Sequence, residues 1–373
     1  MRLQLIPLCI ALLSVANCQP STQTPQTVKK TEQDEVSLSW FTSSPLKGSD
    51  RISKSDAKSF IQHVYQSLDR QIFDPTFKQK EREAQLQTLL KQMDAKPQWT
   101  RSEVTQLISR ELQELKTSHI RVLDPVEGAK LFRLFEQAPS ALESKSAVSA
   151  QMRGSIGVLS IKSFIVPQIS QAAIAQAKSQ LSSAKIILLD LRGNGGGDIP
   201  SLIEDVVGAD KVMTIDRTRN GLAVQEPVIL RGYYNDTTGE TAPDLLAEKG
   251  YIQWRTRFEA KKDPRPWFIL VDDQCGSACE VFAAIAQDNQ SAKILGVRTM
   301  GAVLAGEAFR LKWQGFALIA PTAQVFSPNG KRIEGVGVHP DIPIPGCANH
   351  GSQCLEKAIE AIERVTFQKR LSS

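Results

Sequence analysis

The sequence predicts a mixed α/β protein in which a small bundle of helices precedes a core of alternating strands and helices. Residues 52–117 carry apolar positions at helical spacing, with capping signals at Ser53 or Ser55 and at Thr100 or Ser102. From residue 150 to residue 370, short apolar runs alternate with helical stretches, a pattern typical of an α/β domain. The two regions together predict an α/β (α+β) fold class, with a small helical bundle before the core.

Composition fits this class and excludes one kind of partner. The 373 residues are 41% hydrophobic and 23% charged, an ordinary globular balance for two or three domains. The formal net charge is only +5, and lysines and arginines are interspersed with acidic residues. Because no basic stripe forms, we expect no nucleic-acid partner.

The N-terminus is typical of an exported protein. In residues 1–18, Arg2 precedes an apolar run too short to span a membrane, followed by small residues, as in a signal peptide. Residues 14–16 suit cleavage after Ala16, whereas S-V-A-N-C resembles the lipobox of bacterial lipoproteins, with Cys18 as the lipidated residue. The protein is thus expected to be periplasmic, either attached to a membrane through a lipid on Cys18 or free, or else secreted. Residues 19–48 begin with a Pro-, Thr- and Gln-rich run and are expected to form a flexible tether.

The remaining chain divides at a change of pattern near residue 120. We expect a helical bundle over 49–122 and the α/β core over 123–373. Apolar, β-branched runs predict the core strands. The clearest of these runs are GSIGVLSIKSF (154–164), KIILLDL (185–191), PWFILVDD (266–273), AKILGVRT (292–299) and FALIAPTAQVF (316–326).

Four cysteines remain after the signal peptide, in two close pairs. Export favours disulfides over metal sites. Cys347 and Cys354 enclose a short loop that a disulfide could close, and Cys275 and Cys279 could be bridged around the turn between them. The four thiols lack the paired C-x2-C spacing of structural zinc sites, so we expect no metal and no cofactor.

Two stretches could carry chemistry. In LLDLRGNGGG (188–197), three glycines after a buried strand can present bare backbone N–H groups, and the missing G-K-[ST] argues against a phosphate loop. In the second stretch, Ser277 follows a buried strand and opens a helix. Ser277 and Glu280 form the S-x-x-E pattern of a helix capping box, but a serine in such a turn is also where hydrolases expose a nucleophile.

These stretches occur in a recognisable order. DLRGNGGG, GSACE, GVRTMG and SPNGKRIEGVGVHPDIPI together resemble the S41 family of serine peptidases, the C-terminal processing and tricorn-type group. The resemblance covers about 185–345 and implies a spiral fold similar to ClpP and crotonase. It makes Ser277 the nucleophile. The oxyanion hole would come from the amide of Ala278 and from a glycine of the triple-glycine loop, Gly195 or Gly196.

The residue that would act as general base differs from the one used in the better-known branch of that family. Processing peptidases use a lysine directly after T-x-G, and here Ala302 stands at that position, which excludes a Ser–Lys dyad. The tricorn-like branch uses a histidine preceded by a serine, together with a distant glutamate. Ser118, His119 and Glu334 match that pattern, with His119 as general base and Glu334 and Ser118 orienting its ring. His119 on its own could also be an ordinary loop histidine, and Glu334 a solvated charge.

The resemblance leaves three functions to distinguish. The first is a serine endopeptidase acting on protein or peptide substrates, without the PDZ domain of the processing peptidases, because too few residues separate Pro125 from Gly154 to hold one. The second is a catalytically inactive module that binds a hydrophobic ligand or peptide. The third is a crotonase-like acyl-CoA enzyme, which export disfavours because CoA is a cytosolic cofactor.

Overall fold

The computed structural model describes residues 36–136, 147–165, 167–232 and 248–371. The predicted signal peptide, Cys18 and residues 19–35 of the predicted tether lie outside these ranges. Within them, no helix is both long enough and apolar enough to cross a membrane.

Helices dominate the first part of the described chain. The capping signals resolve to Ser53, whose hydroxyl accepts from the amide of Asp56 at 3.1 Å, and to Thr100, which forms a reciprocal capping box with Glu103. A short strand ends at each of these two cap residues, and the two strands pair antiparallel. The elements are α1 (Leu38–Thr42), β1 (Arg51–Ser53), α2 (Lys54–Gln71), α3 (Gln79–Gln92), β2 (Gln98–Thr100), α4 (Arg101–Glu114), β3 (Arg121–Leu123) and α5 (Pro125–Glu136).

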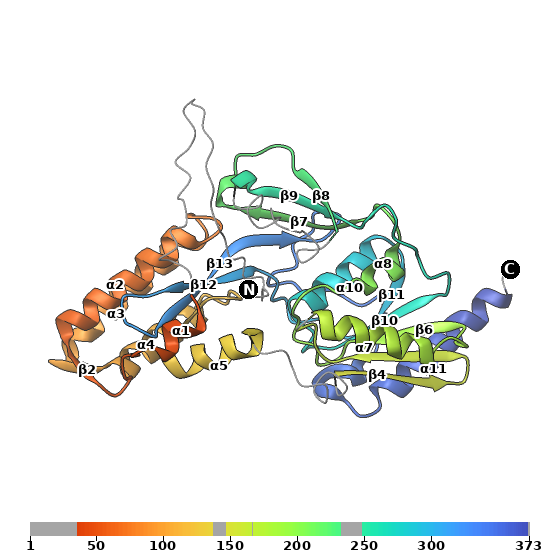
Figure 1. Cartoon of the computed structure of the whole chain (residues 1–373), viewed down its shortest axis with the longest axis horizontal. Helices are drawn as coiled ribbons and strands as arrows, with labels where there is room; N and C mark the ends of the chain where they lie inside the picture. Colours follow the sequence, from red (N-terminus) through yellow and green to blue (C-terminus); the bar gives the residue numbers. More distant parts are fainter. Residues whose placement is uncertain (1–35, 137–146, 166, 233–247, 372–373) are drawn as a thin grey trace.

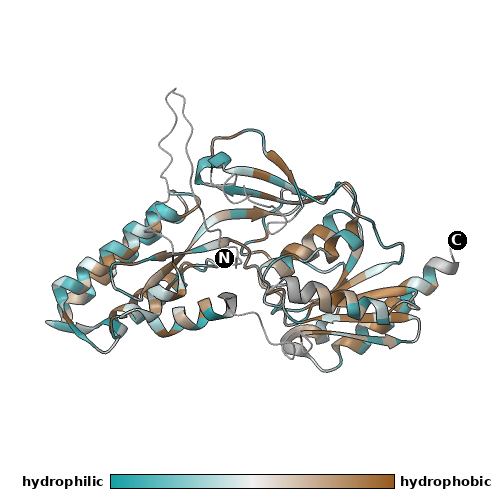
Figure 2. Ribbon diagram, viewed as in Figure 1, coloured by the Kyte–Doolittle hydropathy of each residue, from teal (hydrophilic) through white to brown (hydrophobic). Residues whose placement is uncertain are grey.

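The α/β core is built on a six-stranded sheet of order β14-β11-β10-β6-β5-β4, in which every pairing is parallel except β4–β5. Its strands are largely hydrophobic (Figure 2) because both faces are covered. Helices α7, α8 and α10 cover one face and α11 the other. The elements are β4 (Val148–Arg153), β5 (Ile156–Ile161), α7 (Pro167–Gln180), β6 (Ile186–Asp190), α8 (Leu202–Val207), β10 (Trp267–Val271), α10 (Ala278–Asp288), β11 (Ala292–Gly296), β14 (Ile342–Pro343) and α11 (Cys354–Leu371).

A second sheet, of order β12-β13-β7-β9-β8, was not expected from the sequence. It is antiparallel apart from β8–β9, and β3 adds to it by pairing with β13. Its strands from the 205–265 region are short and half-buried, and a half-buried strand gives a weak apolar signal. The elements are β7 (Val212–Thr218), β8 (Val228–Arg231), β9 (Tyr251–Arg255), β12 (Ala305–Arg310) and β13 (Ala317–Phe326).

The long strand β13 connects the two parts of the molecule. Figure 1 shows α2, α3 and α4 at one end, the six-stranded sheet with α11 at the other, and β12 and β13 running between them. Helices α2 and α4 share one hydrophobic cluster with β12 and β13. The α/β fold class predicted from the sequence is confirmed, and the helices form a common core with the second sheet.

Candidate active site

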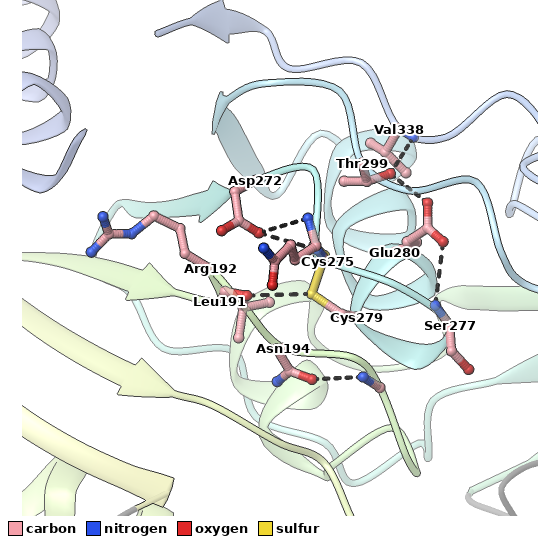
Figure 3. The surroundings of a disulfide bond; sticks show 12 residues. Leu191, Arg192, Asn194, Asp272, Cys275, Ser277, Cys279, Glu280, Thr299 and Val338 are labelled. Carbon is pink, nitrogen blue, oxygen red and sulfur yellow. Dashed lines mark hydrogen bonds between the residues drawn. A yellow bond between two sulfur atoms is a disulfide. The ribbon is translucent and has the colours of Figure 1, made fainter. Parts of the chain in front are cut away.

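Ser277 occupies a strained turn between β10 and α10. Its φ of 55° and ψ of −128° lie in a region that non-glycine residues rarely adopt. Its backbone N–H donates to the carbonyl of Ala302 at 3.0 Å and to Glu280 Oε2 at 3.3 Å. Figure 3 shows the Ser277 hydroxyl pointing away from Glu280. The turn therefore places a half-buried hydroxyl at the N-terminal end of α10, where helix amides point outward.

The glycine-rich loop packs directly against this turn. A side chain at Gly196, whose φ is 100°, would put its Cβ 2.6 Å from the Cβ of Ser277 and 2.9 Å from the amide nitrogen of Ala278. Only glycine fits there. The amide of Gly196 already donates to Asn194 Oδ1 at 2.9 Å. In the described ranges, the amides of Gly195 and Ala278 have no acceptor, and Gly195 is exposed.

A buried disulfide encloses the serine turn. Cys275 and Cys279 are joined, so the bond spans Gly276, Ser277 and Ala278 (Figure 3). Asp272 Oδ1 accepts from the amide of Cys275 at 3.1 Å and from the amide of Gly193 at 3.0 Å. One buried carboxylate thus holds the turn and the glycine-rich loop together. The structure also joins Cys347 to Cys354, beside α11.

Three residues predicted to act together are hydrogen-bonded in a line. His119 Nδ1 lies 2.9 Å from Ser118 Oγ, and Ser118 Oγ donates to Glu334 Oε2 at 2.8 Å. The amide of Ser118 donates to the other oxygen of Glu334 at 2.8 Å. Glu334 is only 3% exposed, so it is not a solvated hairpin charge. Ser118 stands between the carboxylate and the ring, so its hydroxyl connects Glu334 to His119.

This line of bonds assigns the tautomer of His119. The single hydroxyl proton of Ser118 goes to the carboxylate, so Ser118 Oγ accepts from His119 Nδ1–H. The other ring nitrogen, Nε2, then carries the lone pair. Burial lowers the pKa of His119, the charge of Glu334 opposes that shift, and Arg121 adds to it. The ring is therefore neutral at neutral pH and can accept a proton.

Segment 301–304 separates the serine turn from the histidine line. Its Ala302 carbonyl accepts from the amide of Ser277, and its Val303 amide donates to Glu334 at 2.8 Å. At the adjacent Gly306, a Cβ would lie 2.7 Å from that of His119, so this glycine makes room for the histidine. In the described part of the chain, no hydrogen bond joins the Ser277 hydroxyl to the His119 ring.

Sequence reasoning missed the contacts of two buried polar residues. Asn194 connects the glycine-rich loop to β5 and to the serine turn. Its Nδ2 donates to the Ile161 carbonyl, and its backbone carbonyl accepts from the Gly276 amide. Glu280, expected only as a helix cap, accepts four hydrogen bonds. The S-x-x-E pattern marked Glu280 but indicated only one of its partners. Among the described residues, no group of three or more histidine, cysteine or acidic side chains could hold a metal ion.

Comparison with known proteins assigns the family. Residues 155–344 match the sequence profile of Peptidase family S41, slightly more than half of the chain. The chain belongs to peptidase family S41. The matched segment contains Ser277, Glu334 and the glycine-rich loop, whereas Ser118 and His119 precede it.

Curated relatives of this S41 chain are processing-type proteases. A carboxy-terminal-processing protease of Bartonella bacilliformis is 28% identical over 206 residues, which is 53% of this chain and 41% of that protein. A probable CtpA-like serine protease of Staphylococcus epidermidis is 26% identical over 200 residues, 53% of this chain and 35% of that protein. The match therefore spans about two fifths of the length of these relatives.

Solved structures share the fold at low sequence identity. Mature CPAF complexed with lactacystin superposes with a TM-score of 0.56 at 12% identity, over 84% of this chain and 98% of that one. The tricorn protease superposes with a TM-score of 0.53 at 13% identity, over 85% of this chain and 37% of that one. The S41 fold, with its ClpP-like core, thus extends over the helical part as well as the matched segment.

Proposed function

We propose that this S41 chain is a serine endopeptidase that hydrolyses peptide bonds, with Ser277 as nucleophile and His119 as general base. The hydrogen-bonded line Glu334–Ser118–His119 carries the proposal, because it holds a half-buried, neutral imidazole, and segment 301–304 links this line to the strained serine turn. A ligand-binding module has no need to hold an imidazole in one tautomer with a buried carboxylate.

In the first step, His119 Nε2 accepts the proton of Ser277 as its hydroxyl attacks the carbonyl carbon of the substrate. The carbonyl oxygen becomes an anion, and the amides of Ala278 and Gly195 stabilise it. We favour Gly195 over Gly196 because the amide of Gly196 is already bonded to Asn194. The imidazolium then protonates the leaving amine, and water releases the acyl group from Ser277 by the reverse steps.

Glu334 acts on the ring through Ser118. The carboxylate fixes the Ser118 hydroxyl, that hydroxyl orients the His119 ring, and the buried negative charge stabilises the imidazolium as it forms. Ala302, at the position of the lysine in the processing branch, takes no part in proton transfer. Ser277, His119, Ser118 and Glu334 together form the proposed catalytic set, and no cofactor is required.

The proposed substrates are proteins or peptides outside the cytoplasm. The signal-like residues 1–18 support export, and Cys18 would carry the lipid if the chain is anchored to a membrane. Selection of the substrate then depends on surfaces other than a PDZ groove, because the 28 residues between Pro125 and Gly154 are too few to form a PDZ domain.

Mass spectrometry of casein tests this proposal. The chain from residue 19 and its Ser277→Ala variant are incubated with casein in parallel. We expect fragments from the unsubstituted chain alone, while Ser277→Ala lowers the free energy of unfolding by about 1 kcal/mol at most, the value of a helix cap. Equal cleavage by both would reject Ser277 as nucleophile, and cleavage by neither would favour the ligand-binding module.

A further inference from the structure

Four consecutive backbone amides point at two buried carboxylates. These are the amides of segment 301–304, which we call the bridge segment. The first two donate to Glu280 at 2.6 and 2.7 Å, and the last two to Glu334 at 2.8 and 3.3 Å. Both glutamates are almost fully buried, at 0% and 3% exposure. The bridge segment is therefore held between one carboxylate from α10 and one from the histidine line.

The bridge segment also touches the nucleophile. The carbonyl of Ala302 accepts from the Ser277 amide at 3.0 Å, and the Leu304 amide lies 3.3 Å from Ser118 Oγ. One short segment thus contacts the residue before the proposed base at one end and the proposed nucleophile near the other. A shift of this segment would change the distance between nucleophile and base.

Helix capping alone does not explain Glu280. The capping contact, from the Ser277 amide, is the longest of its four hydrogen bonds, at 3.3 Å. The three shorter bonds, of 2.5 to 2.7 Å, come from Thr299 Oγ1 and from the first two bridge amides. Thr299 Oγ1 in turn accepts from the Val338 amide at 2.7 Å, so Glu280 also reaches the segment that follows Glu334.

We infer that Glu280 is a positioning residue of the proposed peptidase, which sets the distance between Ser277 and the His119 line by fixing the bridge segment. The inference rests on the proposed function. Glu280 touches no substrate in this role, because it acts through backbone amides. Its removal should lower the turnover rate and leave substrate binding nearly unchanged, since a misplacement of about 1 Å can cost about a hundredfold in rate.

The test compares Glu280→Gln with the unsubstituted chain. The glutamine side chain keeps the shape of glutamate but places an amide NH2 where a carboxylate oxygen accepted. We expect kcat on a fluorogenic peptide to fall about 10- to 100-fold, with KM changed less than about threefold. We also expect faster hydrogen exchange in peptides covering the bridge segment.

Glu204→Gln is the matched control. Glu204 is 7% exposed on α8 and, like Glu280, accepts from a backbone amide, that of Arg257, at 3.0 Å. Among the described residues, no hydrogen bond joins Glu204 to the bridge segment. The kcat of Glu204→Gln and the hydrogen exchange of its bridge segment should therefore equal those of the unsubstituted chain. Should Glu280→Gln fail to fold, Thr299→Val, which removes one of the four donors, is expected to lower kcat about threefold or more with the same KM.

The outcomes separate the two proposals. An active Glu280→Gln enzyme with unchanged kcat overturns the positioning role and leaves the peptidase intact. An equal fall in kcat for Glu204→Gln also overturns it, because loss of any buried carboxylate would then suffice. An unsubstituted chain that cleaves nothing overturns the proposed function and the positioning role with it. A selective fall in kcat with faster bridge exchange supports the positioning role.

Discussion

His119 determines how the site should respond to pH. Burial lowers the pKa of its ring below the usual 6.5, with Glu334 opposing the shift and Arg121 adding to it. A base must be neutral to accept a proton, so the acidic limb of the kcat/KM profile should fall below pH 6.5. The same shift affects folding, because the unfolded chain binds a proton on His119 more readily than the folded chain does. The free energy of unfolding should therefore decrease as the pH falls below 6.5.

Arg121→Gln tests this assignment. The Arg121 charge lowers the pKa of His119, so removing that charge should move the acidic limb to higher pH while the plateau rate stays the same. The measurement is a kcat/KM profile from pH 4 to pH 9. Arg51→Gln, at another exposed arginine, is the control and should leave the acidic limb in place. A limb that does not respond to Arg121→Gln would argue against His119 as the titrating base.

The two loop glycines should respond oppositely to alanine. At Gly196 the φ of 100° and the 2.6 Å approach to the Ser277 Cβ leave no room for a methyl group. We expect Gly196→Ala to destabilise the chain by about 1–3 kcal/mol and to abolish turnover by displacing Ser277. At Gly195 a Cβ would meet nothing within 4 Å, so Gly195→Ala should fold with a free energy of unfolding within about 0.5 kcal/mol of the parent. Urea denaturation distinguishes the two outcomes.

Among the structural elements, the two disulfides should differ in what they affect. Cys347–Cys354 is buried at the start of α11, in the hydrophobic cluster on the face of the sheet opposite α10. Replacing both cysteines with alanine should lower the free energy of unfolding by about 2 kcal/mol and leave kcat unchanged. The same replacement at Cys275 and Cys279 should lower kcat as well, because that bond encloses Ser277. Equal kcat values for the two double variants would contradict this difference.

Over the whole molecule, the helices and the second sheet should unfold together. Phe60 of α2 stacks on Trp313, with ring centroids 3.4 Å apart, and both belong to the cluster that α2 and α4 share with β12 and β13. We expect Phe60→Ala to cost about 3–5 kcal/mol. Circular dichroism and tryptophan fluorescence should still report one transition in urea. Val126→Ala, at a side chain 77% exposed, should change the stability by less than about 0.5 kcal/mol. Helices that melted separately from the sheets would refute the shared core.

The sequence by itself determined the features that depend on neighbouring residues. Buried strands such as Ile186–Asp190 and Trp267–Val271 show as continuous apolar runs, because a strand covered on both faces has no polar side. The helix starts near Ser53 and Thr100, the glycine-rich loop and the serine turn before α10 likewise depend on short spacings, although the choice of Ser53 over Ser55 and of Thr100 over Ser102 came from the structure. Together these local patterns predicted the fold class and the family.

Only the tertiary structure decided how distant residues meet. Ser118 and Glu334 are separated by 216 positions, and no local spacing encodes their two hydrogen bonds. The placement of Ser118 between carboxylate and ring, the engaged amide of Gly196 and the hold of Glu280 on the bridge segment all depend on the packing of separate loops. The short strands β7, β8 and β9 also depend on their partners, since half-buried strands gain most of their stability from cross-strand contacts.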